Sequence, residues 1–338
     1  MKCSLSHYRG DKAMINKAIL LVGGRGTRLE ELTKNTPKPM LKVAGAPVTE
    51  HQIARAQAAG ISEIVLATSY LAEVFKPYFG DGSKFGISIK YAVEEQALGT
   101  GGAIANAAKS LNLAKDESIF IFNGDVLSGH DLKAQAEFHE SKGADATLHL
   151  VRVEDARAYG CVPLDLDGKV LEFLEKMDQP KVNTINAGCY IFNKRAIEQI
   201  RPDAVVSVER QTFPELLENK GALYGYIDDS YWIDMGTPAS YIQASKDLVL
   251  NSTISPATRQ VRDAVIISKE AKVDATAMIS DGSVIESGVT VGARCQIKGS
   301  IISAGASIGD RSIIDNCYIA PNVSIASNKK ISGEIINN

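Results

Sequence analysis

The chain has 338 residues, of which 45% are hydrophobic and 23% are charged, and its formal net charge is −3. This composition excludes a disordered or collagen-like chain, and the length predicts two domains. Basic residues form no stripe or tail, so we expect no nucleic-acid partner. No apolar run reaches the roughly 18 residues of a membrane span, and no signal peptide is recognisable. We therefore expect no membrane contact and a cytoplasmic location.

The first part of the chain alternates strand and helix patterns. Short apolar runs predict strands, and the longer segments between them predict helices. This alternation predicts crossover connections and a Rossmann-like α/β fold with a mixed or mainly parallel sheet. An Asp-Gly pair predicts a hairpin over 162–176. The predicted strands are 17–24, 63–70, 87–94, 118–126, 146–153 and 186–193, and the predicted helices are 47–60, 101–111, 131–143 and 238–250.

From about Val265 the chain repeats isolated Ile and Val residues at six-residue spacing, interrupted by two five-residue steps. Small residues and glycines fill the gaps. This is the pattern of hexapeptide repeats, and it predicts a left-handed parallel β-helix. A β-rich tail with chance spacing is the alternative. The repeat positions are Val273, Ile279, Ile285, Val291, Ile297, Ile302, Ile308, Ile314, Ile319, Ile325 and Ile331.

Five cysteines and five histidines are scattered along the sequence. The cysteine count is odd and no CxxC pair occurs, which predicts neither a disulfide framework nor a zinc site. A reducing compartment fits this usage. The histidines match no metal or triad pattern, and we expect His51, in a predicted helix, to be structural.

A glycine-rich bend follows the first predicted strand, in the stretch LLVGGRGTRLEELTKNTPKPMLKV (20–43). Backbone amides in such a bend can approach phosphate closely, although an ordinary strand–helix turn has the same composition. The dinucleotide fingerprint fails because Leu29 stands where the third glycine belongs, and no lysine follows as in a Walker loop. Arg28 and Lys38 are the two cations near the bend.

The longer pattern, GRGTR followed by eight spacer residues and PKP, resembles the signature of nucleotidyltransferases that make nucleoside-diphosphate sugars. The segments LLVGGRGTRL, TPKPMLKV and PVTEHQI are most similar to the branch that forms GDP-mannose. Where the family usually has a proline after GTRL, this chain has Glu30 and Glu31. The resemblance covers roughly residues 15–250. The repeat tail extends it to the C-terminus.

The resemblance implies GTP and mannose 1-phosphate as substrates, Mg²⁺ as cofactor, and in-line displacement of diphosphate. Glucose 1-phosphate with UTP, dTTP or ATP remains an alternative, as does a non-catalytic regulatory subunit. A nucleotidyltransferase domain would cover 14–250, after an extension without fixed structure over 1–13. A linker (251–263) and the β-helix domain (264–338) would follow. Because stacked coils need an end cap or a partner, we expect a homo-oligomer formed through the β-helix.

The resemblance also implies a nucleotide site. The cations of the bend would neutralise a triphosphate whose charge rises as diphosphate leaves. The base would lie in the segment EEQALGTGG, where Glu94, Glu95 or Gln96 would read its edge. The expected nucleotide-binding residues are Leu21, Val22, Gly24, Gly26, Thr27, Arg28, Lys38, Gly99, Thr100, Asn123 and Asp125.

Two aspartates are the expected metal ligands. Asp125 follows a predicted strand, and open α/β sheets bind ligands at the carboxyl ends of their strands. Asp234 precedes a glycine turn in WIDMGTP. Carboxylate oxygens suit Mg²⁺, and the resemblance implies that this pair holds it.

A sugar-phosphate site is the last part that the resemblance implies. Lys176 would hold the phosphate and Glu175 the sugar hydroxyls, in a segment whose usual proline is displaced to Pro180. Gly160 and Asn186 would complete this site. The residues expected to be catalytic are Arg28, Lys38 and Lys176.

Overall fold

The computed structural model describes residues 14–24, 29, 32–33, 36–69, 71–174, 176–201 and 204–337. The extension expected over 1–13 lies outside these residues. Within the described ranges, no helix has both the length and the apolar character that crossing a membrane requires.

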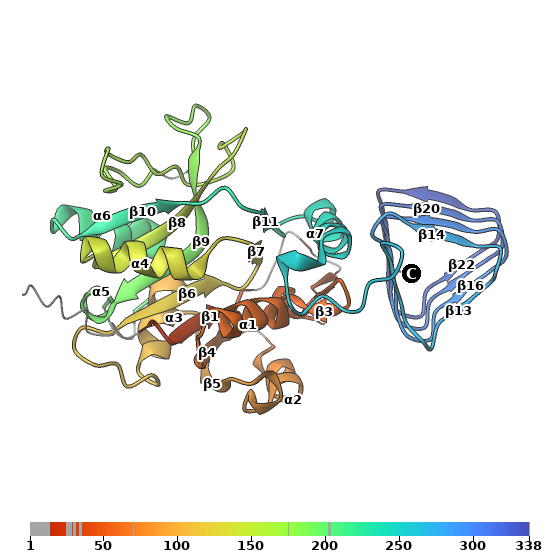
Figure 1. Ribbon diagram of the computed structural model, residues 1–338, viewed down its shortest axis with the longest axis horizontal. Helices are drawn as coiled ribbons and strands as arrows, with labels where there is room; N and C mark the ends of the chain where they lie inside the picture. The colour runs from red at the N-terminus through yellow and green to blue at the C-terminus, as the bar shows by residue number, and fades with distance from the viewer. Residues whose placement is uncertain are drawn as a thin grey trace, which may run out of the picture.

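A seven-stranded sheet organises the first part of the chain (Figure 1). Its strands are β1 (Lys17–Leu21), β4 (Glu63–Thr68), β5 (Ser88–Val93), β6 (Ser118–Asn123), β8 (Ala146–Arg152), β9 (Thr184–Asn193) and β10 (Leu223–Ile227). Their order in the sheet is β10-β8-β9-β6-β1-β4-β5. β1 pairs in parallel with β4 and β6, whereas β9 is antiparallel to β6 and β8. This mixed, mainly parallel sheet confirms the predicted fold class.

Helices cover both faces of the sheet. Along β1, Ile19 packs in the core on one face, and Ala18 and Leu20 pack in the core on the other, because successive side chains of a strand alternate. The Ile19 face is covered by α3 (Gly99–Ala108), α5 (Lys194–Glu198) and α6 (Phe213–Glu218). The opposite face is covered by α1 (Val48–Ala58), α2 (Phe75–Phe79) and α4 (Leu132–Lys142).

Two short ladders and several single turns complete this domain. An antiparallel pair joins β7 (Val126–Ser128) to β11 (Trp232–Asp234), and a second joins β2 (Lys42–Val43) to β3 (Ala46–Pro47). The hairpin predicted over 162–176 is present only as isolated antiparallel bridges. The remaining helical segments are the 3₁₀ turns η2 (Lys38–Met40), η3 (Ala72–Val74), η4 (Ser83–Phe85) and η6 (Ser252–Ile254), the π-helix η5 (Val208–Thr212), and α7 (Pro238–Leu250).

The C-terminal region is a parallel β-helix of three stacked sheets, which confirms the prediction from the repeat. Each repeat position, from Val273 to Ile331, is the second residue of its strand. The strands are β12 (Ile266–Ile267), β13 (Lys272–Val273), β14 (Met278–Ser280), β15 (Val284–Ile285), β16 (Thr290–Val291), β17 (Gln296–Lys298), β18 (Ile301–Ile302), β19 (Ser307–Ile308), β20 (Ile313–Asp315), β21 (Tyr318–Ile319), β22 (Ser324–Ile325), β23 (Lys330–Ser332) and β24 (Ile335–Ile336).

One sheet of the β-helix is apolar on its outer face as well. Its strands pair in register, so that their first residues form a column. This apolar column packs against α7, which lies between the large sheet and the β-helix in Figure 1. The column consists of Ile266, Val284, Ile301, Tyr318 and Ile335.

Candidate active site

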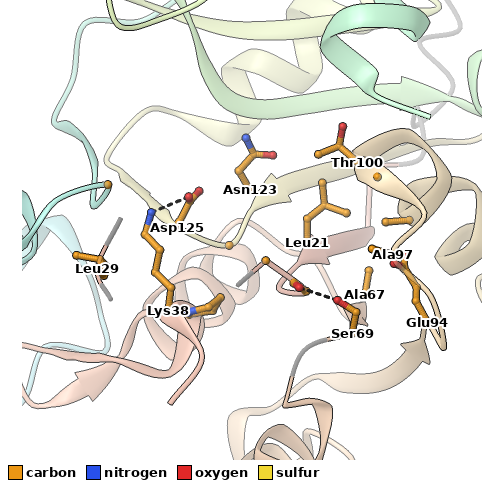
Figure 2. A pocket seen from close by; sticks show the side chains of 17 residues that line it. Leu21, Leu29, Lys38, Ala67, Ser69, Glu94, Ala97, Thr100, Asn123 and Asp125 are labelled. Carbon is orange, nitrogen blue, oxygen red and sulfur yellow. Dashed lines mark hydrogen bonds and ion pairs between the residues drawn. The ribbon is translucent and has the colours of Figure 1, made fainter. Parts of the chain in front are cut away.

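A cleft of about 450 Å³ lies at the carboxyl ends of β1, β4 and β6. Figure 2 shows Lys38 and Asp125 at one end of the cleft and Glu94 at the other, with Asn123 and Leu21 between them. The carboxyl edge of parallel strands is where open α/β sheets bind ligands. The arrangement suits an elongated ligand that carries charge at one end and hydrogen-bonding groups at the other.

The charged end of the cleft is a buried lysine between two carboxylates. Lys38 Nζ lies 2.7 Å from Asp125 Oδ2 and 3.5 Å from Asp234 Oδ1. The lysine side chain is 7% exposed, whereas those of Asp125 and Asp234 are 37% and 20% exposed. The lysine is therefore the most enclosed of the three groups, and the Asp125 carboxylate is open to the cleft.

The two aspartates meet because two short strands pair. In the β7–β11 ladder Asp234 lies opposite Val126, the neighbour of Asp125. The backbone N–H of Met235 also donates to the carbonyl of Asp125 at 3.1 Å. Residues more than a hundred positions apart are thus held side by side by backbone hydrogen bonds.

An interruption between two strands directs Asp125 into the cleft. The strand predicted over 118–126 is two strands, β6 and β7, separated by Gly124 and Asp125. Gly124 N–H donates to the Leu21 carbonyl at 2.9 Å, and a Cβ at Gly124 would lie 2.4 Å from that oxygen. Gln52 Nε2 donates to the carbonyls of Asn123 and Val126, at 2.7 and 2.8 Å, and braces the turn from both sides. Only glycine allows this close approach.

Lys38 is held by a rigid local segment. It begins the 3₁₀ turn η2, with Pro37 before it and Pro39 after it. Proline fixes φ, which reduces the freedom of the loop. Thr49 in α1 donates its hydroxyl to the Pro39 carbonyl at 2.9 Å. The ammonium group is therefore delivered to the cleft by a stiff turn anchored on α1.

The opposite end of the cleft presents Glu94. Leu98 N–H donates to its Oε2 at 3.2 Å, while its Oε1 is buried and has no partner among the residues that the structure describes. Burial raises the pKa of Glu94, and the hydrogen bond from Leu98 opposes the shift. Glu95 and Gln96 are exposed. Of the three residues expected to read a base, Glu94 is the one that lines the cleft with an unsatisfied acceptor.

A hydrogen-bond network behind the cleft joins Thr100 to Asn186. Thr100 Oγ1 and Ser207 Oγ donate to Glu209 Oε2 at 3.0 and 3.1 Å. Glu209 Oε1 accepts from the Tyr190 hydroxyl at 3.5 Å, and that hydroxyl accepts from Asn186 Nδ2 at 2.8 Å. Glu209 lies on the π-helix η5, a rare element that often marks functional sites. The network fixes the start of α3 relative to β9.

The residues expected from the sequence fall into three groups. Those that line the cleft are Leu21, Gly24, Lys38, Gly99, Thr100, Asn123 and Asp125, with Asp234 in contact with Lys38. Those that lie outside the described residues are Gly26, Thr27, Arg28 and Glu175.

The third group lies away from the cleft lining. Val22 is fully buried in the core. Asn186 N–H donates to the Gly160 carbonyl at 3.1 Å, so these two expected sugar-site residues are adjacent. Lys176 is exposed and is not part of the described cleft lining.

Sequence reasoning missed Glu209 and Tyr190. Neither belongs to a glycine-rich or charged motif, since Tyr190 reads as a strand residue and Glu209 as a surface charge. The only sequence signal was a carboxylate among the hydroxyl-rich residues of VVSVERQT. This pattern indicates a functional role only once the fold is known, because the fold places Thr100 within hydrogen-bond distance of Glu209.

The carboxylate pair fits a divalent cation. Oxygen donors from one or two carboxylates, completed by substrate phosphates, are the usual surroundings of Mg²⁺ in phosphoryl-transfer sites. Asp125 and Asp234 already hold a cationic group, the Lys38 ammonium, between their oxygens. No cluster of three or more metal-ligating side chains occurs in the described ranges, so a metal here would need oxygens from the substrate.

The histidines and cysteines that the structure describes take no part in the cleft. Four cysteines are buried as free thiols. His51 Nδ1 lies 2.7 Å from Ser255 Oγ, and its Nε2 lies 2.8 Å from the Val43 carbonyl. Burial lowers the pKa of His51 to about 4. This ring is neutral at pH 7 and joins the linker to β2.

Two family descriptions match the chain. The description "Nucleotidyl transferase" matches residues 17–251, and "GMPPB C-terminal domain" matches residues 261–337. The chain is 47% identical to a Mycobacterium tuberculosis protein named mannose-1-phosphate guanylyltransferase, over 83% of this chain and 78% of that protein. It is 35% identical to mannose-1-phosphate guanylyltransferase 1 of Arabidopsis thaliana, with the same coverage.

Solved structures also resemble this chain. HddC from Yersinia pseudotuberculosis is 30% identical and superposes with a TM-score of 0.60, over 69% of this chain and 100% of HddC. The same protein complexed with GMP-PN gives a TM-score of 0.59 over the same shares of the two chains. A putative glucose-1-phosphate thymidylyltransferase from Bacillus anthracis, at 24% identity, has a TM-score of 0.61 over 68% of this chain and 93% of that one, which supports the fold alone.

Proposed function

The chain belongs to the nucleotidyl transferase family, and from this premise we propose that it converts GTP and mannose 1-phosphate to GDP-mannose and diphosphate. The single observation that carries the proposal is the pairing of Lys38, Asp125 and Asp234 at one end of the cleft with Glu94 at the other. The names of the Mycobacterium and Arabidopsis relatives support mannose 1-phosphate and a guanine nucleotide. The GMP-PN complex of HddC also fits a guanine nucleotide.

Glu94 supports the choice of guanine. Its unsatisfied Oε1 is an acceptor, and the guanine edge offers two adjacent donors, N1–H and N2–H₂. Adenine presents no such pair, and a uracil or thymine ring presents a single N–H. Guanine can donate to both carboxylate oxygens at once, whereas the other bases can donate to only one, so the pocket would favour guanine over them.

In the proposed reaction, a phosphate oxygen of mannose 1-phosphate attacks the α-phosphorus of GTP. A new P–O bond forms as the bond from that phosphorus to the bridging oxygen breaks, and the electron pair leaves with diphosphate. The attacking phosphate monoester is largely ionised near pH 7, because its second pKa is about 6. No general base is needed, and catalysis consists of alignment and charge stabilisation.

The chain's own residues would divide this work. Lys38 would stabilise negative charge on the triphosphate as diphosphate leaves, joined by Arg28 from the bend. Lys176 would orient the attacking phosphate, and Glu175, Gly160 and Asn186 would hold the sugar. The backbone at Gly24, Gly26 and Thr27 would lie against the phosphates, with Leu21 and Asn123 beneath the nucleoside. Gly99 and Thr100 would support the base.

Enzymes of this family generally use a divalent metal, and we propose Mg²⁺ here. Asp125 and Asp234 would hold it. When bound, it would withdraw charge from the phosphate oxygens. Removal of Mg²⁺ with a chelator should abolish turnover, and added Mg²⁺ should restore it.

We also propose self-association through the β-helix. Within the described chain, the last coil (324–337) pairs on one side only, so its backbone edge is open. An open strand edge favours pairing with another chain. Light scattering on the full chain would test this, because the proposal predicts a mass of two or more chains and a monomer would refute it.

The deciding experiment measures diphosphate release with GTP, ATP, UTP and dTTP, each with mannose 1-phosphate and glucose 1-phosphate. The proposal predicts the highest kcat/KM for GTP with mannose 1-phosphate. A preference for glucose 1-phosphate with another nucleotide would replace it. Absence of turnover with every pair would support a regulatory subunit instead.

A further inference from the structure

The β-helix has no role in the reaction proposed above, yet it packs on the helix that joins the charged groups of the cleft. Asp234 ends β11, and α7 begins at Pro238, directly beyond the turn. We propose that the β-helix is a rigid support that fixes Lys38 relative to Asp234, with Tyr318 as a positioning residue that acts through Tyr241. This inference rests on the proposed function.

The first contacts join α7 to the segment after Lys38. The Tyr241 hydroxyl donates to the Lys42 carbonyl at 2.7 Å, and Ala44 N–H donates to Ser245 Oγ at 3.0 Å. Tyr241 and Ser245 lie one turn apart on α7, so they share a face of the helix. Both are almost completely buried. α7 therefore grips the Lys38 segment through two buried hydrogen bonds while it continues directly from Asp234.

The second contacts join α7 to the β-helix. The Tyr318 ring meets the Tyr241 ring edge-on, with centroids 5.8 Å apart. Tyr318 lies in the apolar column that covers α7. At the edges of this contact Lys246 Nζ lies 2.5 Å from Asp281 Oδ2, and Lys42 Nζ lies 3.5 Å from Glu286 Oε1.

Glu286 also ties the Lys42 side chain to the next coil. Its Oε2 accepts from the backbone N–H of Ala304 at 3.1 Å. Lys42 is therefore held twice, through its carbonyl by Tyr241 and through its ammonium by Glu286. We expect the Tyr318–Tyr241 ring pair to stabilise the contact more than the two ion pairs do, because exposed ion pairs contribute little free energy.

A stacked coil is stiff because each strand pairs with strands of the neighbouring coils. The apolar column therefore offers α7 a rigid surface, which limits movement of α7 when substrates bind in the cleft. Misplacement of a reacting group by about 1 Å can lower turnover by about 10²-fold, so rigidity here would have kinetic value. The base end of the cleft is built on β4, β5 and α3, which lie outside this contact.

The experiment compares Tyr318→Ala and Tyr318→Phe with Ile313→Ala. Ile313 is the first residue of β20, an outward position on a different sheet of the same β-helix, and it does not belong to the apolar column that packs on α7. We expect Tyr318→Ala to lower kcat by about 10- to 100-fold. It should also weaken the Mg²⁺-dependent part of GTP binding, measured by calorimetry, and leave Mg²⁺-free binding within about twofold. Tyr318→Phe, which keeps the ring, should restore kcat, and Ile313→Ala should match the wild type.

Equal kcat for Tyr318→Ala and Ile313→Ala would overturn the inference. If Tyr318→Ala does not fold, Tyr241→Phe decides, because it removes only the hydroxyl bonded to the Lys42 carbonyl. A several-fold loss of kcat in Tyr241→Phe supports the inference, and an unchanged kcat refutes it. An inactive wild type would instead refute the proposed function, so the two failures are distinguishable.

Discussion

The cleft and the β-helix use sequence in opposite ways. In the β-helix one rule repeats along the chain, and each coil buries its Ile or Val against the coils beside it. In the cleft, single residues from distant segments meet once, as Lys38 and Asp234 do across 196 positions. The β-helix therefore distributes stability over many equivalent residues, whereas the cleft concentrates its chemistry in a few. Substitutions should therefore affect the two regions in opposite ways.

Lys38→Met should have the largest effect on activity. Loss of a group aimed at developing negative charge typically costs 10²- to 10³-fold in kcat, and we expect a drop near ~10³-fold. The thermal midpoint should fall, because removal of the buried ammonium leaves two neighbouring carboxylates without their cation, so turnover is compared at a temperature at which both proteins are folded. Diphosphate release assays measure this, with exposed Lys133→Met as the charge-matched control. If Lys38→Met retained more than a tenth of wild-type kcat, the assigned role would be wrong.

Ile314→Ala in the β-helix should show the reverse behaviour. Ile314 is fully buried, and removal of a large buried aliphatic side chain costs ~3 kcal/mol of unfolding free energy. Because Ile314 packs inside the β-helix and not in the column that contacts α7, kcat should stay within about twofold of wild type. Denaturant unfolding and the same assay test both parts. An unchanged free energy of unfolding, or a large loss of kcat, would contradict the view that the β-helix interior contributes stability and the cleft contributes catalysis.

Acid should weaken the N-terminal domain before the β-helix, which contains no histidine. Burial lowers the pKa of His139 and His149 to about 4, as it does for His51. The unfolded chain therefore binds protons first as the pH falls below 6.5. The stability contributed by each neutral ring is complete above that pH and is lost progressively down to about pH 4, by about 2 kcal/mol for each histidine at pH 5.

His139→Gln tests this sign directly. Its ring nitrogens bond Ser118 Oγ and Thr147 Oγ1, at 2.9 and 2.8 Å. The difference in unfolding free energy between pH 7 and pH 5 should be about 2 kcal/mol smaller in the variant than in the wild type. An unchanged difference would mean that His139 does not cause the acid sensitivity.

Glu94→Gln should have the smallest of these effects and should alter selectivity. The amide offers a donor where guanine needs a second acceptor, so the preference for GTP over ATP should fall by about tenfold. The exposed neighbour changed in the same way, Glu95→Gln, should leave the preference unchanged. Competition between the two nucleotides in one assay measures the ratio. Equal selectivity in both variants would remove Glu94 from base recognition.

The sequence predicted the β-helix well because periodicity is a local signal. Each Ile or Val at the repeat spacing faces inward whatever the rest of the chain does. The outer column was also visible, as the apolar doublets at 266–267, 284–285, 301–302, 318–319 and 335–336. Most strands of the other two sheets have a polar residue before the apolar one, and the exceptions are 278–279 and 313–314. The single-residue spacing rule overlooked the column. Doublets on one sheet indicate burial on both faces, and hence a docking surface.

The cleft could be predicted only in part. The glycine turns and predicted strand ends indicated that Asp125 and the glycine-rich bend lie at an edge of the sheet. The family resemblance then indicated that Lys38 and Asp234 belong to the same site. The ladder between β7 and β11 that joins the aspartates, and the carboxylate of Glu209 beneath Thr100, depend on pairings across a hundred or more positions. No local pattern encodes such pairings, because their energy arises only when the sheet has formed.

The most direct test of the account measures GTP binding by calorimetry with and without Mg²⁺, in the wild type and in Asp125→Asn/Asp234→Asn. If these two carboxylates hold a metal against the triphosphate, Mg²⁺ should strengthen binding at least tenfold in the wild type and have no effect in the double variant. An equal gain from Mg²⁺ in both proteins would contradict the account, since the metal would then be held elsewhere.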